Sequence, residues 1–156
     1  LLEICGEIEH GQVVGIDIDI RQHNRIEIEK HPLYKKITML EGSSIAPEII
    51  SEVHKIANSK KRVMVFLDSN HTHKHVLEEL NLYSPIVSKG SYLVVFDTIV
   101  EDLPEKLISD RPWGKGNNPK TAVWEFLKDN KDFEIDTNID NKLLISVAPD
   151  GYLRKK

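Results

Sequence analysis

Residues 62–71 read Arg-Val-Met-Val-Phe-Leu-Asp-Ser-Asn-His, and they are the strongest indication of the fold class. Its apolar part, 63–67, is continuous, as expected of a strand that helices cover on both faces. A polar turn begins at Asp68, and residues 72–82 then place Val76 and Leu80 on one helical stripe. A buried strand that leads into a helix indicates an α/β sheet.

The same alternation of strands and helices extends in both directions along the chain. We expect strands near 12–18, 36–40, 62–67, 92–97, 132–136 and 142–148, with helices near 21–29, 47–57, 72–82 and 121–128. The last two strands have no helix between them, which predicts a closing antiparallel pair. We also expect Trp124 to lie in the core, and residues 154–156 to form a solvated tail.

The composition bounds the class of protein. The chain has 156 residues, 40% of them hydrophobic, and a net charge of -4, which fits one globular domain over residues 1–156. That charge gives no electrostatic reason to bind nucleic acid, and no apolar run is long enough for a membrane helix. A single cysteine, Cys5, excludes an internal disulfide and suits a reducing cytoplasm. We expect a cytoplasmic protein; its oligomeric state, including a homo-oligomer, stays open.

The start of the chain is unusual. It has no initial Met, and it opens with Leu1, Leu2, Ile4, Cys5 and Ile8 at helical spacing before His10-Gly11. We therefore expect a chain that lacks an upstream part of its domain.

Polar side chains follow every predicted parallel strand. They are Asp17 and Asp19, then Glu41-Gly42-Ser43-Ser44, then Asp68-Ser69-Asn70-His71, then Asp97-Thr98. In open α/β sheets, ligands bind outside the carboxyl ends of the strands, and an acid after the second strand is where ribose hydroxyls are often held. Such residues are also common in ordinary turns. Because the pattern recurs at four successive strands, we favour a binding site.

Several of these motifs, in order, resemble the cephalosporin hydroxylase/rhamnosyl O-methyltransferase family. The resemblance rests on Gly15-Ile16-Asp17-Ile18-Asp19-Ile20-Arg21, Glu41-Gly42-Ser43-Ser44, Leu67-Asp68-Ser69-Asn70-His71-Thr72-His73, Arg111-Pro112-Trp113-Gly114 and Asn117-Asn118-Pro119-Lys120-Thr121-Ala122-Val123. It implies a Rossmann-like class I methyltransferase sheet, mainly parallel with a C-terminal antiparallel strand. It also implies S-adenosylmethionine as cofactor and a small hydroxylated substrate, a sugar or natural product. The first strand of that fold and its Gly-rich loop are missing from this sequence.

The resemblance also assigns roles to single residues. Asp17 would hold the ribose of the cofactor, and the Ser43-Ser44 turn would approach its adenine. Asp68 and Asp97 would bind Mg²⁺, and His71 would be the general base. In one departure from the family, Phe96 stands where relatives often have a metal-binding Glu, which leaves the third protein ligand open.

Coordination chemistry supports the metal prediction independently. Mg²⁺ prefers oxygen ligands and commonly uses one or two carboxylates, which Asp68 and Asp97 could supply from neighbouring strand ends. The metal would lower the pKa of a substrate hydroxyl, and an imidazole could accept its proton near neutral pH. The expected geometry is that both carboxylates converge on one cation, with His71 facing them and His75 facing away. In the alternative, Asp68 only caps the following helix.

Two other functions stay open. Asp68, His71 and His75 could form the two-histidine, one-carboxylate iron site of a hydroxylase, since the histidines are four residues apart. Alternatively, the chain is a non-catalytic fragment of such a domain. The Pro- and Gly-rich loop 110–118, which carries Trp113, could border a substrate or be a mere connector.

Overall fold

The computed structural model describes residues 11–156, so the helix predicted for residues 1–8 and Cys5 lie outside the described part. The chain divides into two compact units, Leu1–Val53 and His54–Lys156. Within the described residues, no helix is both long and apolar enough to cross a membrane. The prediction of one domain is not tested by this division.

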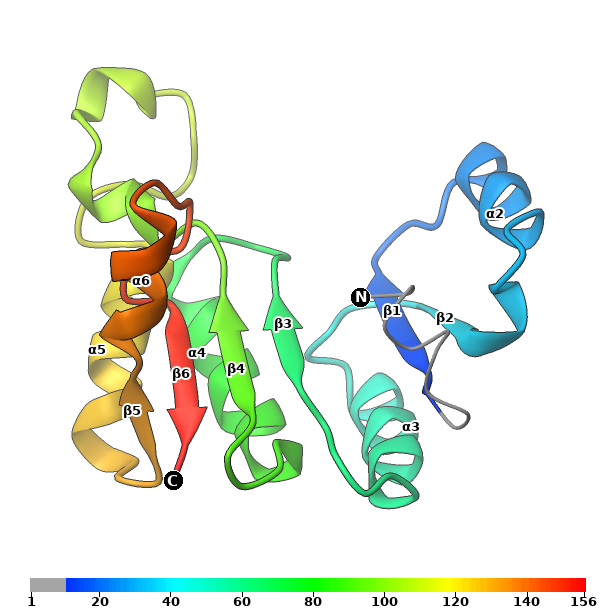
Figure 1. Ribbon diagram of the computed structural model, residues 1–156. Helices are drawn as coiled ribbons and strands as arrows, with labels where there is room; N and C mark the ends of the chain where they lie inside the picture. The colour runs from blue at the N-terminus through cyan, green and yellow to red at the C-terminus, as the bar shows by residue number, and fades with distance from the viewer. Residues whose placement is uncertain (1–10) are drawn as a thin grey trace. The chain divides into compact units, whose positions relative to one another are not determined.

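The first unit contains a two-stranded parallel sheet. Strand β1 (Val13–Asp17) pairs in register with β2 (Ile37–Glu41), so that Asp17 lies opposite Glu41. Helix α2 (Gln22–Glu29) and the 3₁₀ turn η1 (Tyr34–Lys36) form the crossover between the two strands (Figure 1). A parallel pair requires such a crossover, and the alternation in the sequence predicts it correctly.

Helix α3 (Pro47–Asn58) follows β2 through a tight turn at Gly42. Gly42 has φ +152°, and a Cβ there would lie 3.0 Å from the Ile49 side chain, so the turn requires glycine. Ile49 and Val53 are the buried residues of α3.

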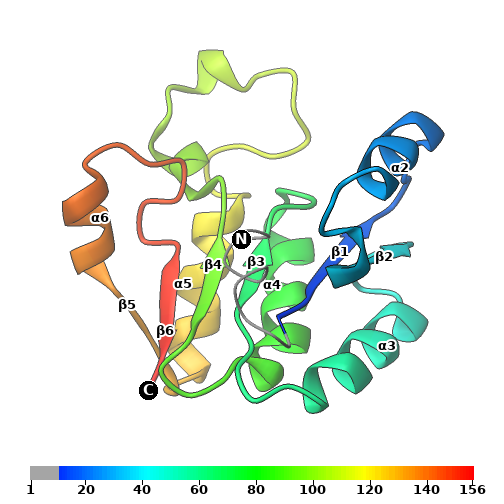
Figure 2. The ribbon, with the colours of Figure 1, turned by 45° about the vertical axis from the view of Figure 1, so that its right-hand side comes forward.

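The second unit contains a mixed sheet of four strands in the order β3-β4-β6-β5. Strand β3 (Val65–Leu67) runs parallel to β4 (Tyr92–Val95), whereas β6 (Tyr152–Lys155) is antiparallel to both β4 and β5 (Phe133–Ile135). Helices α4 (His73–Tyr83) and α5 (Pro119–Asp129) lie side by side behind this sheet (Figures 1 and 2).

Short helical turns connect these elements. They are η2 (Ser84–Ile86), η3 (Thr98–Asp102), η4 (Glu105–Leu107) and α6 (Thr137–Leu143). The core between sheet and helices consists of aliphatic and aromatic side chains from both layers, among them Leu67, Val76, Leu80, Leu93, Val95, Ala122, Val123, Phe126, Phe133 and Leu153. Burial of these side chains is the main source of stability of this unit.

The predicted closing strand 142–148 is wrong. Leu143 ends helix α6, and Leu144 and Ile145 are exposed, the latter to 93%. The last strand is instead Tyr152–Lys155, so the first two residues of the predicted tail 154–156 belong to a strand, although Arg154 is exposed as predicted. Lys155 donates to the Ser84 carbonyl oxygen, and its amine lies 5.5 Å from the centroid of the Phe133 ring. The closing pair is antiparallel as predicted, but α6 lies between its strands.

Trp124 is not a core residue, because 46% of it is exposed. The buried stripe of α5 runs through Ala122, Val123 and Phe126. A residue two positions after Ala122 lies on the opposite side of a helix, and an indole there meets solvent. The α/β class and the antiparallel last strand agree with the prediction, whereas the sheet expected to be mainly parallel is mixed, because β6 is antiparallel to both of its neighbours. The strand order of a complete Rossmann-like sheet stays a prediction, since the strands form two separate sheets.

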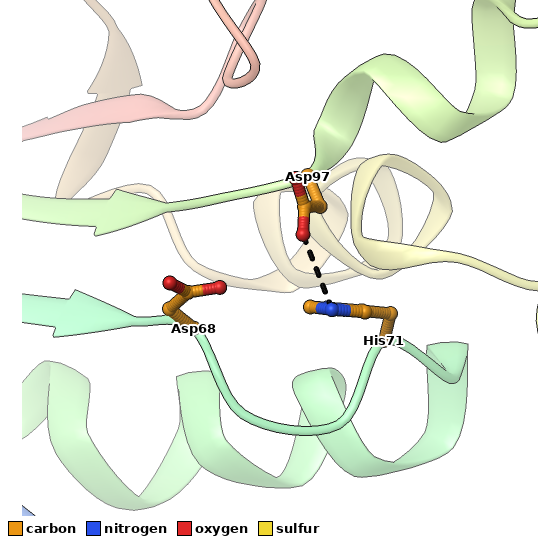
Figure 3. Close-up of side chains that lie close together, drawn as sticks. All are labelled: Asp68, His71 and Asp97. Carbon is orange, nitrogen blue, oxygen red and sulfur yellow. Dashed lines mark ion pairs between the residues drawn. The ribbon is translucent and has the colours of Figure 1, made fainter.

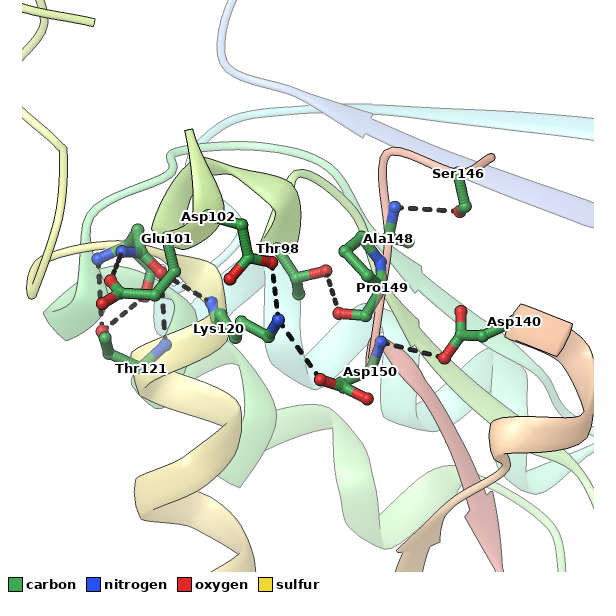
Figure 4. Close-up of polar contacts among 11 residues, drawn as sticks. Thr98, Glu101, Asp102, Lys120, Thr121, Asp140, Ser146, Ala148, Pro149 and Asp150 are labelled. Atoms are coloured by element: carbon green, nitrogen blue, oxygen red, sulfur yellow. Dashed lines mark hydrogen bonds and ion pairs between the residues drawn. The ribbon is translucent and has the colours of Figure 1, made fainter. Parts of the chain in front are cut away.

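A buried lysine ties α5 to the segments around β4 and β6. Lys120 is 6% exposed, and its amine lies 2.7 Å from the Asp102 carboxylate and 3.2 Å from that of Asp150 (Figure 4). Burial lowers the pKa of Lys120, but the hydrogen bonds to Asp102 and Asp150 outweigh it and leave the pKa raised. Beside it, Thr98 donates to the Pro149 carbonyl oxygen at 2.7 Å. These contacts fix the segment after β4.

Candidate functional site

The parallel strands β3 and β4 lead into the two acids that the sequence singles out. Asp68 follows β3, and Asp97 lies two residues beyond β4, while His71 stands in the turn after Asp68. One ligand atom from each of these three side chains lies within 4.8 Å of the other two (Figure 3). The His71 Nε2 is 3.1 Å from the Asp97 Oδ2. We call Asp68, His71 and Asp97 the acidic cluster.

Local interactions explain the backbone conformation around the acidic cluster. Asn70 Oδ1 accepts hydrogen bonds from the Thr72 N–H and hydroxyl, which closes the turn before α4. Helix α4 begins at His73 with Thr72 as its N-cap, so Asp68 is not the helix cap. Asp97 has φ 55°, the left-handed conformation that aspartate tolerates better than most residues. A residue held there is often part of a functional site.

An aromatic side chain packs against His71. The Trp113 ring meets the imidazole edge to face, with centroids 4.8 Å apart, and the Arg111 guanidinium lies 5.6 Å from the indole centroid. The loop 103–118 carries both residues. Glu101 fastens this loop by accepting hydrogen bonds from the Gly116 N–H and the Asn118 side chain. The loop that could border a substrate therefore contacts the acidic cluster through Trp113. Its role toward a substrate stays a prediction.

A buried carboxylate lies beneath the turn that carries Asp68 and His71. Glu79 of α4 is 2% exposed and accepts a 2.7 Å hydrogen bond from the Ser69 hydroxyl. His75 Nε2 lies 3.5 Å from the same carboxylate oxygen. Burial and the Glu79 charge raise the pKa of Tyr83 to about 12.

Glu79 is not among the site residues predicted from the sequence, although a signal for it is present. Positions 76, 79, 80 and 83 of α4 form its buried stripe, and Glu79 is the one charged residue on it. A carboxylate on an apolar helical stripe needs a partner or a function.

The iron-site hypothesis is not supported by this geometry. His75, its second histidine, lies against Glu79 and is not a member of the acidic cluster. Phe96 has no atom that could ligate a metal, and its ring stacks on that of Phe66 with the centroids 6.3 Å apart. Among the described residues, Asp68, His71 and Asp97 lie close enough together to hold a metal ion, and their metal role stays a prediction.

The predicted cofactor residues Asp17, Ser43 and Ser44 lie in the first unit. Asp17 is exposed, and its Oδ1 accepts from the Asp19 N–H at 3.0 Å. The backbone carbonyl of Asp17 accepts from the Gly42 N–H at 2.8 Å, which joins the turn after β1 to the turn after β2. Ser43 and Ser44 follow directly and are half-buried. Their cofactor role stays a prediction.

Comparison with known proteins gives a consistent family. Residues 2–156 match the family described as Rhamnosyl O-methyltransferase/CmcI. The Rhamnosyl O-methyltransferase of Mycobacterium tuberculosis H37Rv is 32% identical over 120 residues, covering 75% of this chain and 46% of that protein. The corresponding protein of Mycobacterium leprae is 30% identical over 122 residues, covering 77% of this chain and 51% of its own length. The chain thus spans about half the length of these relatives.

One solved structure shows a partial likeness. It is the MycE methyltransferase from the mycinamycin biosynthetic pathway, solved in complex with Mg and SAH. The sequence identity is 20% and the TM-score 0.49, over 76% of this chain and 28% of that one.

Proposed function

Because this chain belongs to the Rhamnosyl O-methyltransferase/CmcI family, we propose that it supports the transfer of a methyl group from S-adenosylmethionine to a small-molecule hydroxyl, assisted by Mg²⁺. The observation that carries the proposal is the convergence of Asp68, His71 and Asp97 within 4.8 Å. Two acids and one base at the carboxyl ends of parallel strands suit proton removal beside a cation.

The donor set fits a hard divalent cation. Asp68 and Asp97 would hold it with carboxylate oxygens, which Mg²⁺ prefers over imidazole nitrogen. A bound Mg²⁺ would supply Lewis acidity, lowering the pKa of the acceptor hydroxyl and orienting its oxygen. His71 then remains available as a base instead of serving as the third ligand.

His71 would accept the proton of the acceptor hydroxyl. Asp97 lies 3.1 Å from its Nε2 and orients the ring, and Trp113 packs against it. S-adenosylmethionine would supply the methyl group, and His71 would take up the proton that the acceptor hydroxyl loses. A positioned base of this kind contributes about 10²- to 10⁴-fold to the rate.

The cofactor would be held by residues of the first unit. Asp17 would accept hydrogen bonds from the ribose hydroxyls, and the Ser43-Ser44 turn would contact the adenine. The hydrogen bond between the Asp17 carbonyl and the Gly42 N–H supports this assignment, because it brings the two turns together. In a longer form of the protein, Asp17→Ala should weaken cofactor binding by about 1–3 kcal/mol.

The acceptor is proposed to be a sugar hydroxyl. The relatives are named for a rhamnosyl group, and the net charge of -4 favours neutral small molecules over nucleic acid.

Mass spectrometry of methylated product tests the proposed function. The chain, and a longer form of it, are incubated with S-adenosylmethionine, Mg²⁺ and a rhamnoside. Product should form, and His71→Ala, Asp97→Asn or chelation of the metal should each reduce the rate at least tenfold. Asp129→Asn, an exposed acid on α5, is the matched control and should leave the rate unchanged. Methylation that survives both chelation and Asp68→Asn would exclude the metal from the reaction.

A further inference from the structure

Glu79 has surroundings that stability alone does not explain. It is 2% exposed, and Ser69 and His75 approach only one of its carboxylate oxygens. The other oxygen, Oε2, is buried without a hydrogen-bond partner in the part of the chain that the structure describes. Burying a carboxylate is costly, and leaving one oxygen unpaired adds to the cost. Replacing such a group by an apolar side chain of similar size often stabilises a protein.

The contact with Ser69 connects this carboxylate to the acidic cluster. Ser69 directly follows Asp68 and precedes His71 by two residues. Its hydroxyl donates a 2.7 Å hydrogen bond to the Glu79 Oε1, and this bond ties the middle of the turn to helix α4. The Asn70–Thr72 hydrogen bonds hold the turn at its far end. Asp68 and His71 are thus carried by a turn fixed at two points.

We propose that Glu79 is a positioning residue for the cation site. Through Ser69, it holds the turn in the conformation in which the Asp68 carboxylate and the His71 imidazole face Asp97. This inference rests on the proposed metal role of the acidic cluster. Groups that orient metal ligands from outside the coordination sphere commonly change metal affinity 10- to 100-fold when they are removed.

Measured metal affinity and stability together distinguish this role from a structural one. Mn²⁺ binding to the 156-residue chain is followed by electron paramagnetic resonance, and unfolding by urea. Glu79→Met should weaken Mn²⁺ binding at least tenfold while the protein stays as stable as the wild type or becomes more stable. Glu79→Gln keeps an oxygen that can accept from Ser69, so its affinity should remain within about threefold of wild type.

Two further variants complete the design. Ser69→Ala removes the donor from an exposed position, so folding is retained, and it should weaken Mn²⁺ binding as Glu79→Met does. Glu78→Gln removes an exposed charge from the neighbouring position of α4 and should change nothing.

The outcomes separate this inference from the proposed function. If the wild type binds Mn²⁺ and Asp97→Asn does not, but Glu79→Met and Ser69→Ala bind as tightly as the wild type, the positioning role is wrong. If the wild type and Asp97→Asn bind equally weakly, the metal site itself is wrong. If Glu79→Met fails to fold, Ser69→Ala decides: weaker binding supports the role, and unchanged binding overturns it.

Discussion

The two pairs of parallel strands in this molecule end in similar residues but in different surroundings. In the first unit, β1 and β2 end at Asp17 and Glu41, both exposed, and Glu41 pairs with Arg25 at 3.0 Å. In the second unit, β3 and β4 lead to Asp68 and Asp97, with His71 between them. None of the residues of β1 and β2 is buried, whereas Leu93, Val94 and Val95 of β4 all are.

An acid at a strand end therefore indicates a site only when the surrounding side chains hold it in place. The acidic cluster lies beside the packed helices of the second unit. Glu79 binds Ser69, Trp113 packs against His71, and Asn70 closes the turn before α4. The turns of the first unit are fixed mainly by backbone hydrogen bonds, such as that from the Gly42 N–H to the Asp17 carbonyl. Fixed charge is what a cation site needs, since Mg²⁺ demands near-ideal geometry.

The largest difference between the two units is expected when one glycine of each is replaced by alanine and the free energy of unfolding is measured. A Cβ on Gly151 would lie 2.2 Å from the Val95 carbonyl oxygen, whereas a Cβ on Gly15 has nothing within 4 Å. Gly151→Ala should therefore lower the free energy of unfolding by about 3 kcal/mol or more. Gly15→Ala should be neutral or raise it by about 0.5 kcal/mol. Urea unfolding measures both, and equal effects would contradict the difference in packing.

A second test measures how the stability of the second unit changes at alkaline pH. Burial and Glu79 raise the pKa of Tyr83 from 10.0 to about 12. The folded protein thus keeps a proton that the unfolded chain loses, so stability is complete below pH 10 and falls as pH rises from 10 to 12. A shift of this size amounts to roughly 2–3 kcal/mol.

Tyr83→Phe removes this titration. The loss of unfolding free energy between pH 9 and pH 12 should be smaller in the variant than in the wild type by that amount. Comparing pH differences cancels the contributions of the other tyrosines and of the lysines. An identical pH dependence in both proteins would contradict the burial of Tyr83 beside Glu79.

The ion pair of Lys120 should contribute more than a comparable pair in the first unit. Lys120 is buried and bonds to both Asp102 and Asp150, which stay half-exposed. Lys120→Met keeps the apolar stem and removes the charge, and it should cost about 2 kcal/mol. Chemical denaturation at neutral pH measures this, and a cost below about 0.5 kcal/mol would mean that the network does not hold α5 in place.

The smallest effect is expected at the Arg25–Glu41 pair of the first unit. Its side chains are 32% and 51% exposed, and surface pairs of this kind contribute about 0.2–1 kcal/mol. Arg25→Ala should lower the unfolding free energy by about 0.5 kcal/mol at low salt, and by less in 1 M NaCl. A cost equal to that of Lys120→Met would remove the distinction between the two regions.

The sequence predicts the strands that are continuously apolar, and through them the acidic cluster. Residues 63–67 and 92–95 are apolar, and Asp68 and Asp97 come one and two residues after β3 and β4, at the end of the sheet where ligands bind. Leu93, Val94 and Val95 of β4 are buried, whereas Met64 and Phe66 are 44% and 38% exposed, so the cover expected on both faces of residues 63–67 is wrong. The last strand was not predicted, because its composition is not typical of a strand. Tyr152–Lys155 is short and half polar, whereas the exposed run 143–147 is the more strand-like in composition.

Side chains that act through tertiary contacts could not be predicted from local pattern. Trp113 meets His71 across forty-two positions of sequence, and only the loop fastened by Glu101 brings them together. The sequence shows Glu79 as a charge on an apolar helical stripe. Its contact with Ser69 cannot be predicted in this way, because it depends on how α4 packs under the turn.

The cation site at Asp68, His71 and Asp97 can be tested by locating a bound cation. Mn²⁺ is added in small amounts to the ¹⁵N-labelled chain, and paramagnetic broadening of the amide signals is followed by NMR. Signals of residues 68–71 and 97–98 should disappear first, and Asp97→Asn should abolish this selectivity. Earlier loss of signals around the exposed acids Asp129 and Asp132, or uniform broadening, would contradict a cation site at Asp68, His71 and Asp97.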